Sequence, residues 1–230
     1  MEMNSPDLRS KAVDLLKRIR IQVETLSPPV AAFEKGIRDT PFRILISVLL
    51  SSRTRDPVTL AASTRLFSLA QNPLDMARLS REQVENAIFP VGFFRRKAEN
   101  ILEISRRLAR EQGRVPKQVQ ELTQLPGVGR KTANLVRSLA FDIPEVAVDI
   151  HVFRISRRLG WAHGKVPEAV ESELKQLFPA ELWNRINRVL VGFGQTLCRP
   201  RNPRCPDCAI REDCTWYTTR MEKRSTQESC

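Results

Sequence analysis

Four of the five cysteines lie close together near the end of the chain, in a pattern typical of a metal site. Their spacing is Cys198-x6-Cys205-x2-Cys208-x5-Cys214. Four thiolates in one short segment can hold zinc or an iron–sulfur cluster. Structural zinc more often uses two Cys-x2-Cys pairs, and this segment has one. Because disulfides are rare inside cells, we expect a metal centre, and we predict no role for Cys230.

A second unusual feature is the stretch LPGVGRKTANLV, which places Gly127 and Gly129 two residues apart. The residues VQELTQ before it and RKTANLVRSLAF after it both predict helices. A tight turn between two helices needs residues without a Cβ atom, and both glycines are expected to meet that need. Such a turn also exposes backbone amides at a helix N-terminus, where a phosphate can bind. A plain helix–helix connection is the alternative.

The stretch LPGVGRKTANLV, followed by VAVDIH, resembles the helix–hairpin–helix and Gly/Pro–Asp elements of DNA glycosylases, and most closely those of endonuclease III. The resemblance extends from about Pro41 to Cys214 and includes the cysteine spacing, which is similar to the 4Fe–4S loop of that family. It implies a 4Fe–4S cluster held by Cys198, Cys205, Cys208 and Cys214. It also implies that DNA phosphates bind the turn, at Gly127, Val128, Gly129 and Arg130.

The same resemblance implies a catalytic pair, Lys131 and Asp149. Lys131 would be an amine nucleophile that forms a Schiff base with the sugar. The helix macrodipole and Arg130 are expected to lower its pKa, because it lies in the first turn of a helix. Asp149 precedes a helical run and is expected to cap it. In the family, the matching aspartate stabilises the sugar cation and assists proton transfers.

Two loops and a basic segment are further candidates for DNA contact. Phe93, in VGFFRRK, stands where the family usually has a leucine wedge, although Phe93 or Phe94 could instead belong to the core. Arg53, in SSRTRD, stands where the bacterial pattern has glutamine, and an arginine there could bond guanine opposite the lesion. The loop RPRNPR between two of the cysteines adds a basic segment, alternatively a solvated loop, with Arg199, Arg201 and Arg204.

The overall composition agrees with a nucleic-acid partner. The 230 residues carry a formal net charge of +12, and 41% are hydrophobic, as in globular proteins. The charge alone is equally compatible with a basic soluble protein. The densest apolar run, ILISVLL, is too short to span a membrane, and the first residues lack the apolar core of a signal peptide. We therefore expect an intracellular protein, with damaged or abasic double-stranded DNA as its partner, and a monomer.

The expected fold is all-α. Prolines and capping residues punctuate the chain, and alternating strand patterns are missing. Helices are predicted near 6–24, 41–51, 57–70, 81–88, 94–112, 130–140, 150–159, 167–177 and 181–197. The family resemblance implies a two-lobed helix–hairpin–helix glycosylase fold: a six-helix barrel over 33–143, and an iron–sulfur domain from 1–32 plus 144–217. Residues 218–230 are expected to form a flexible tail.

Together these features predict a base excision repair glycosylase with AP lyase activity. The expected substrates are oxidised pyrimidines, such as thymine glycol, in duplex DNA. The nearest alternative is a glycosylase for thymine or uracil opposite guanine. An adenine-removing relative is disfavoured, since such enzymes typically lack a lysine at position 131 and carry a further C-terminal domain. A non-catalytic DNA-binding module is the alternative from another class.

Overall fold

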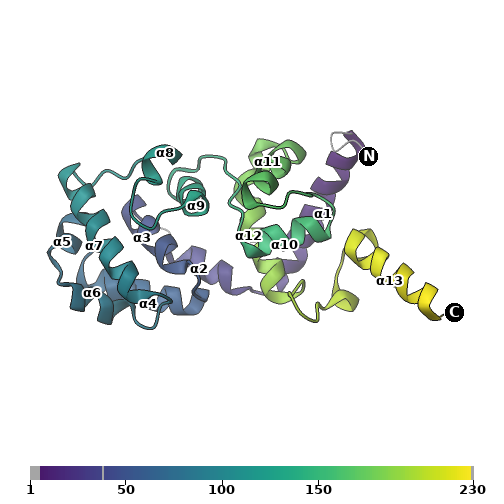
Figure 1. Ribbon diagram of the computed structural model, residues 1–230, viewed down its shortest axis with the longest axis horizontal. Helices are drawn as coiled ribbons and strands as arrows, with labels where there is room; N and C mark the ends of the chain where they lie inside the picture. Colours follow the sequence, from purple (N-terminus) through teal and green to yellow (C-terminus); the bar gives the residue numbers. More distant parts are fainter. Residues whose placement is uncertain (1–5, 38, 229–230) are drawn as a thin grey trace. The chain divides into compact units, whose positions relative to one another are not determined.

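The computed structural model describes residues 6–37 and 39–228, and side chains as far as Met221; Cys230 lies outside the described residues (Figure 1). Throughout these ranges the regular structure is helical and no strand occurs. The predicted all-α fold is therefore confirmed. No helix in the same ranges has both the length and the apolar character needed to cross a bilayer.

The chain folds into two compact units. The central unit comprises Ala32–Glu145, and the terminal unit comprises Met1–Ala31 together with Val146–Cys230. These bounds compare with the sequence-based division into 33–143 and 1–32 plus 144–217. Helix α2, Pro29–Ile37, runs across the first of the two boundaries.

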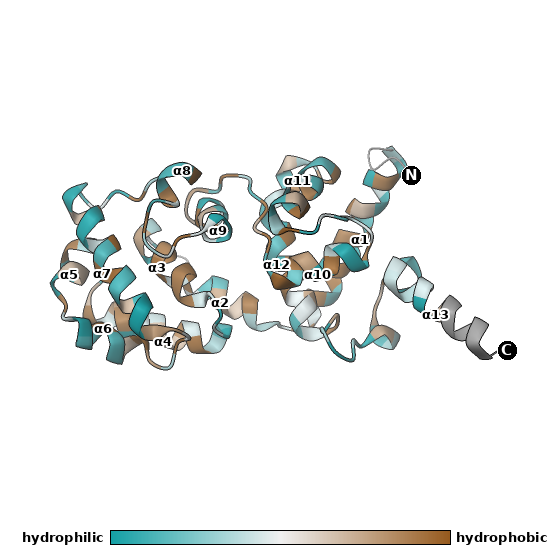
Figure 2. Cartoon of the chain, viewed as in Figure 1, coloured by the Kyte–Doolittle hydropathy of each residue, from teal (hydrophilic) through white to brown (hydrophobic). Residues whose placement is uncertain are grey.

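The central unit is organised around helix α3, Pro41–Ser51, which is buried on every side. A helix that is hydrophobic all round belongs in a core, and Figure 2 shows hydrophobic colour along α3. It packs against α4, α7 and α9, while α5 and α6 pack on α7. The bounds of these neighbours are α4 Asp56–Leu69, α5 Pro73–Arg78, α6 Arg81–Ile88, α7 Phe94–Arg110, α8 Val119–Leu122 and α9 Arg130–Phe141.

The terminal unit has its own core, built where α12 packs on α1 and α10. Its centre includes the fully buried Ile19, Val152 and Ile186. Its helices are α1 Pro6–Thr25, α10 Ile150–Arg158, α11 Pro167–Leu177, α12 Ala180–Thr196 and α13 Thr215–Glu228. Two short 3-10 helices, η1 Cys205–Asp207 and η2 Arg211–Asp213, lie in the cysteine loop.

Helices α3, α5, α6 and α10 begin at a residue whose side chain caps the helix. The side chain of Thr40 accepts a bond from the Arg43 amide, and Ser80 forms the expected capping box with Gln83. Helix α4 begins one residue before the predicted start near residue 57: Arg55 is its N-cap, and Asp56 is its first helical residue. An acidic residue in the first turn is still favourable, because it faces the positive end of the macrodipole.

The segment expected to be a tail differs from the prediction, because residues 218–228 are helical and belong to α13. This helix begins directly after Cys214, with the side chain of Thr215 within 3.3 Å of the Leu159 carbonyl. It is polar, so it has no hydrophobic periodicity by which it could be recognised.

Candidate functional site

The two glycines of the turn before α9 have different roles. Gly127 has φ +77°, and a Cβ atom there would overlap the side-chain amide of Asn100. This position therefore requires glycine. Gly129 has φ −91°, and a Cβ atom would meet nothing within 4 Å. The expectation that both glycines are needed for the turn is wrong for Gly129, whose bare backbone instead leaves open space at the surface.

The amides of this turn are not all available to a ligand. Val128 is 5% exposed, and its N–H donates to the Leu125 carbonyl at 3.1 Å. Its amide is therefore already paired, against the expectation that it binds a phosphate. Gly129 is the N-cap of α9 and is exposed, and no side chain caps this helix. Helix α9 therefore begins at the surface without a capping side chain, directly before Lys131.

Lys131 lies in the first turn of α9, in the central unit, and is half-buried. The positive charge of Lys131 helps to lower the pKa of a second lysine in the same unit, Lys97. The turn, the open helix start and Lys131 thus belong to one local structure. This arrangement suits an amine that must reach a backbone bound at the turn.

Asp149 lies in the terminal unit and caps α10, as the sequence predicts. One carboxylate oxygen, Oδ1, accepts both capping bonds, at 2.8 Å from the His151 amide and 2.9 Å from the Val152 amide. Neither bond uses Oδ2. Asp149 can therefore cap its helix and still present an oxygen to another group. That Asp149 and Lys131 converge on one sugar stays a prediction.

The four cysteines of the loop line one pocket in the terminal unit. None of them is in a disulfide, and all four are half-buried. The pocket is also lined by Arg158, Phe193 and Trp216. Among the described residues, no three His, Cys, Asp or Glu side chains are spaced to hold a single metal ion.

Burial makes three of these thiols hard to ionise, because it raises their pKa. It raises the pKa of Cys208 to about 11, and the nearby cysteines add to the shift. Burial also raises the pKa of Cys205 and of Cys214. The Cys198 sulfur has a cationic neighbour, since Nη1 of Arg158 lies 3.2 Å from it. A bound metal centre would stabilise all four thiolates against the effect of burial.

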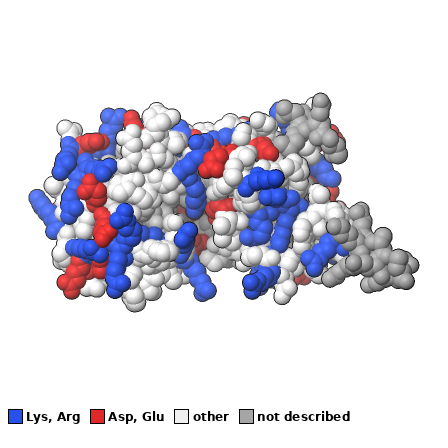
Figure 3. Space-filling model, in the orientation of Figure 1, with Lys and Arg blue, Asp and Glu red and all other residues white. Residues whose placement is uncertain are grey.

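The basic loop beside the pocket is fixed by hydrogen bonds from Arg158. Its guanidinium donates to the carbonyls of Arg199, at 2.9 Å, and of Pro200, at 3.1 Å. The side chains of Arg199 and Arg201 are exposed. Arg204 differs from them, because it forms an ion pair with Asp207 at 2.8 Å and is therefore partly neutralised. Figure 3 shows that Lys and Arg also cover much of the visible face of the molecule.

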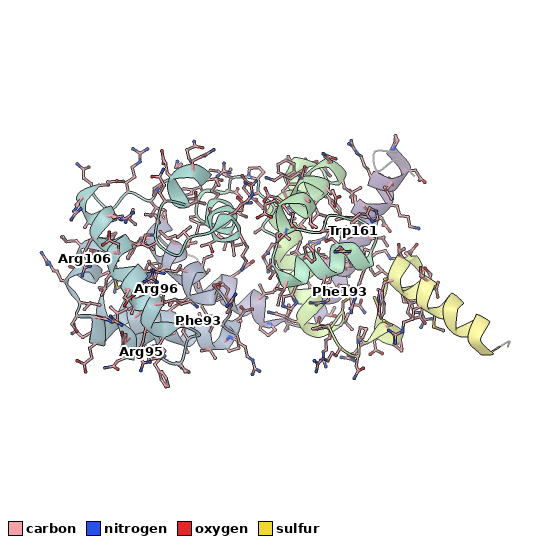
Figure 4. All side chains as sticks on the ribbon, in the orientation of Figure 1. Phe93, Arg95, Arg96, Arg106, Trp161 and Phe193 are labelled. Carbon is pink, nitrogen blue, oxygen red and sulfur yellow. The ribbon has the colours of Figure 1, made fainter. Side chains whose placement is uncertain are left out.

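Phe93 and Arg53 come together at the surface of the central unit. Phe93 is 64% exposed, so the alternative that it belongs to the core is wrong. Phe94 is half-buried and packs edge-on against Phe89. The guanidinium of Arg53 lies 5.5 Å from the centre of the Phe93 ring. Figure 4 places Phe93 near Arg95 and Arg96, which follow it at the start of α7.

Lys97 was missed by the sequence analysis, although a signal for it exists. It is only 7% exposed, and its ammonium donates to the carbonyls of Leu50 and Ser52. The helical spacing of Lys97, Ile101, Ile104 and Leu108 places this lysine on the buried face of α7. A lysine at an apolar position of an amphipathic helix could have been recognised as a buried charge.

Comparison with known proteins identifies the family. Residues 46–180 match the model of the HhH-GPD superfamily base excision DNA repair proteins. Endonuclease III of Thermotoga maritima is 46% identical over 83% of this chain and 91% of its own length, and that of Escherichia coli K12 is 37% identical over 90% and 96%. A solved trapped endonuclease III–DNA covalent intermediate has a TM-score of 0.82 and 32% identity, over 93% of this chain and 98% of that one. The chain therefore belongs to the HhH-GPD superfamily and, within it, to the endonuclease III family of base excision repair DNA glycosylases with AP lyase activity.

Proposed function

We propose that the chain removes oxidised pyrimidines, such as thymine glycol, from duplex DNA and then cleaves the abasic site, with Lys131 as nucleophile. The observation that carries this proposal is the start of α9. There Lys131 follows directly on a helix terminus that no side chain caps and on the bare backbone of Gly129. A DNA phosphate bound at that terminus would bring the neighbouring sugar within reach of the lysine amine.

In the proposed reaction, the Lys131 amine attacks C1′ of the sugar, and the bond between C1′ and the base breaks. The base leaves with the bonding electrons and takes up a proton. Ring opening gives a Schiff base between Nζ and C1′. Loss of a proton from C2′ then expels the 3′-phosphate, and water releases the unsaturated sugar from Lys131. The solved neighbour trapped as a covalent intermediate with DNA supports this type of chemistry.

Asp149 would assist the first and the later proton transfers. Its Oδ1 is committed to capping α10, which fixes the orientation of the carboxylate. Its second oxygen would then stabilise the positive charge that develops on the sugar. A carboxylate held by its own helix needs little reorganisation during the reaction, so its electrostatic effect is retained.

The DNA itself would contact the turn and three exposed side chains. Gly127, Gly129 and Arg130 would hold a phosphate, while Arg199 and Arg201 would add backbone contacts. Phe93 would fill the space of the extruded nucleotide. Arg53 would face the base left unpaired and prefer guanine, because a guanidinium can bond O6 and N7 of guanine together.

Cys198, Cys205, Cys208 and Cys214 would hold a 4Fe–4S cluster. Four thiols on the wall of one pocket fit a cluster that is held by several thiolate ligands. Structural zinc more often uses two Cys-x2-Cys pairs, and this loop has one, so its spacing disfavours zinc. When bound, the cluster would supply structural stabilisation, because the loop that bears Arg199 and Arg201 starts and ends on its ligands.

Borohydride trapping on abasic DNA tests the proposal. Borohydride reduces a Schiff base to a stable amine, so an amine nucleophile leaves protein joined to DNA. Lys131→Gln should abolish the adduct. It should change the affinity for DNA with an abasic analogue by less than about threefold, since the variant loses a single positive charge near the phosphates. Lys117→Gln, at an exposed lysine of the same unit, is the matched control and should trap normally. An undiminished adduct in Lys131→Gln would refute the assignment of the nucleophile.

A duplex panel identifies the substrate and the opposing base. Each duplex carries thymine glycol, another oxidised pyrimidine, or a T·G or U·G mismatch, and each oxidised lesion is placed opposite all four bases. We expect faster excision of oxidised pyrimidines than of mismatched thymine, and a preference for opposing guanine that Arg53→Gln reduces. Faster excision from T·G pairs would favour the mismatch enzyme instead.

A further inference from the structure

The loops that carry Arg53 and Phe93 are joined by direct contacts. The Gly92 amide donates to the Thr54 hydroxyl at 3.1 Å, and the Arg53 guanidinium lies over the Phe93 ring. The backbones also approach closely, because a Cβ atom on Gly92 would lie 2.7 Å from the Arg53 carbonyl oxygen. Arg53 and Phe93 both have positive φ, at 53° and 58°. Non-glycine residues adopt this conformation at an energetic cost, so the surrounding contacts must hold it.

Lys97 provides the strongest of these contacts. Its ammonium donates to the Leu50 carbonyl at 2.8 Å, to the Ser52 carbonyl at 2.6 Å and to the Thr54 hydroxyl at 3.3 Å. An ammonium has three N–H donors, and these three acceptors use all of them. All three acceptors lie in one stretch, the end of α3 and the loop after it. The hydroxyl of Thr54 thus accepts from Lys97 and from Gly92 together.

The position of Lys97 explains why the charge is tolerated. The last carbonyls of a helix lack partners within the helix, and they favour a cation. Burial nevertheless lowers the pKa of Lys97 to about 8, and the positive charge of Lys131 adds to this effect. Buried charged groups generally contribute little to net stability. The specific effect of Lys97 is therefore to fix the shape of the loop at residues 51–54.

We infer that Lys97 is a positioning residue, which fixes loop 51–54 against Gly92 and Phe93 and so sets how Arg53 and Phe93 meet DNA. This inference rests on the proposed function, in which those two side chains contact the extruded nucleotide's neighbours. Lys97 itself is buried and does not touch DNA in this role. The positions of Arg53 and Phe93 matter most when a damaged base must be extruded and the opposing base recognised. It matters less at a site that has already lost its base.

The test compares two reactions of the same variant. Single-turnover excision of thymine glycol from duplex DNA needs base extrusion, whereas strand cleavage at a preformed abasic site does not. In Lys97→Met, the ratio of the first rate to the second should fall about tenfold, since the loss of bonds from a charged donor loosens the loop. The preference for opposing guanine should weaken in parallel. Lys117→Met should leave both unchanged.

Thr54→Val provides a second variant that keeps the buried charge. It removes the hydroxyl shared by Lys97 and Gly92 while preserving the shape of the side chain, and the rate ratio should fall about threefold. Borohydride trapping of abasic DNA counts the active molecules in each preparation. If Lys97→Met fails to fold, Thr54→Val decides the question.

The outcomes separate this inference from the proposed function. An unchanged rate ratio and opposing-base preference in Thr54→Val, with a wild-type protein that traps normally, would overturn the role of Lys97 alone. A proportional loss of both reactions, matching a smaller active fraction, would also overturn it, because that result indicates only lost stability. Failure of the wild-type protein to trap would overturn the proposed function instead.

Discussion

The two roles proposed for Asp149, capping and catalysis, can be separated by substitution. One oxygen, Oδ1, accepts both capping bonds of α10, so an asparagine placed there keeps the capping acceptor and loses only the charge. Alanine loses both. If the carboxylate acts on the sugar, Asp149→Asn should be folded and inactive, whereas Asp149→Ala should be inactive and less stable.

The magnitudes follow from the contacts. Asn and Asp are about equally good N-caps, and loss of the negative charge at a helix start costs about 0.3–1 kcal/mol. Replacement by alanine removes both bonds and should cost about 1–2 kcal/mol. For a chain of this size, each kcal/mol lowers Tm by about 2–4 °C. Loss of the charged oxygen should slow base excision by about a hundredfold or more in both variants.

Thermal melting and single-turnover excision of thymine glycol measure the two effects on the same preparations. Ser80→Ala is the matched control, because Ser80 caps α6 through an analogous bond to the Gln83 amide at 3.1 Å. It should lose a similar amount of stability and keep its excision rate per active molecule. Full activity in Asp149→Asn would refute the catalytic role and leave Asp149 as a helix cap only.

Four other predictions concern the turn before α9, Lys97 and the cysteine loop. Gly127→Ala should lower the unfolding free energy by about 1–3 kcal/mol, because φ is +77° and the Cβ atom would clash, as urea titration can show. Gly129→Ala should change stability by less than about 0.5 kcal/mol yet weaken DNA binding, measured by fluorescence anisotropy, since its Cβ would occupy the open space over the turn. The pKa of Lys97 in the folded state lies near 8, below its ordinary value of 10.5, so between these pH values the unfolded chain binds more protons than the folded one. The unfolding free energy of the wild-type protein should therefore rise with pH in this range. Relative to Lys97→Met, the rise measured by urea titration should be at most about 3 kcal/mol. Cys208→Ala should purify with little iron and sulfide and bind DNA more weakly, with its helical circular dichroism largely kept; full iron content would contradict the ligand assignment.

Local signals in the sequence predict much of the fold. Residues 41–51 and 81–88 form helices with the predicted bounds, because capping side chains and hydrophobic periodicity agree there. Helix α5 was not predicted although Asn72 caps it, since six residues are too few to show a helical period. Helices α2 and α13 were also not predicted, because α2 is short and α13 is polar.

The candidate site shows a different limit. The spacing of the cysteines indicates a metal loop, but only the fold shows that their side chains surround a pocket. The two glycines look equivalent in the sequence, whereas Gly127 alone has a conformation that excludes other residues. The burial of Lys97 could have been inferred from its helical spacing, but its acceptors, the Leu50 and Ser52 carbonyls, could not, because they lie on another helix and loop. Every residue has a backbone carbonyl, so the sequence does not indicate which side chain a given carbonyl will bind.

The distribution of ion pairs explains how the net charge of +12 can serve a specific surface. Arginines on α6 and α7 are offset by nearby acids, as in the contacts of Arg81 with Glu85 and Glu99. Within the described part of the chain, Arg53, Arg199 and Arg201 form no such pair, and all three are exposed. Exposed ion pairs contribute little stability, but they neutralise charge locally. These three residues, which are proposed to contact DNA, therefore keep an uncompensated charge that can displace counterions from phosphates.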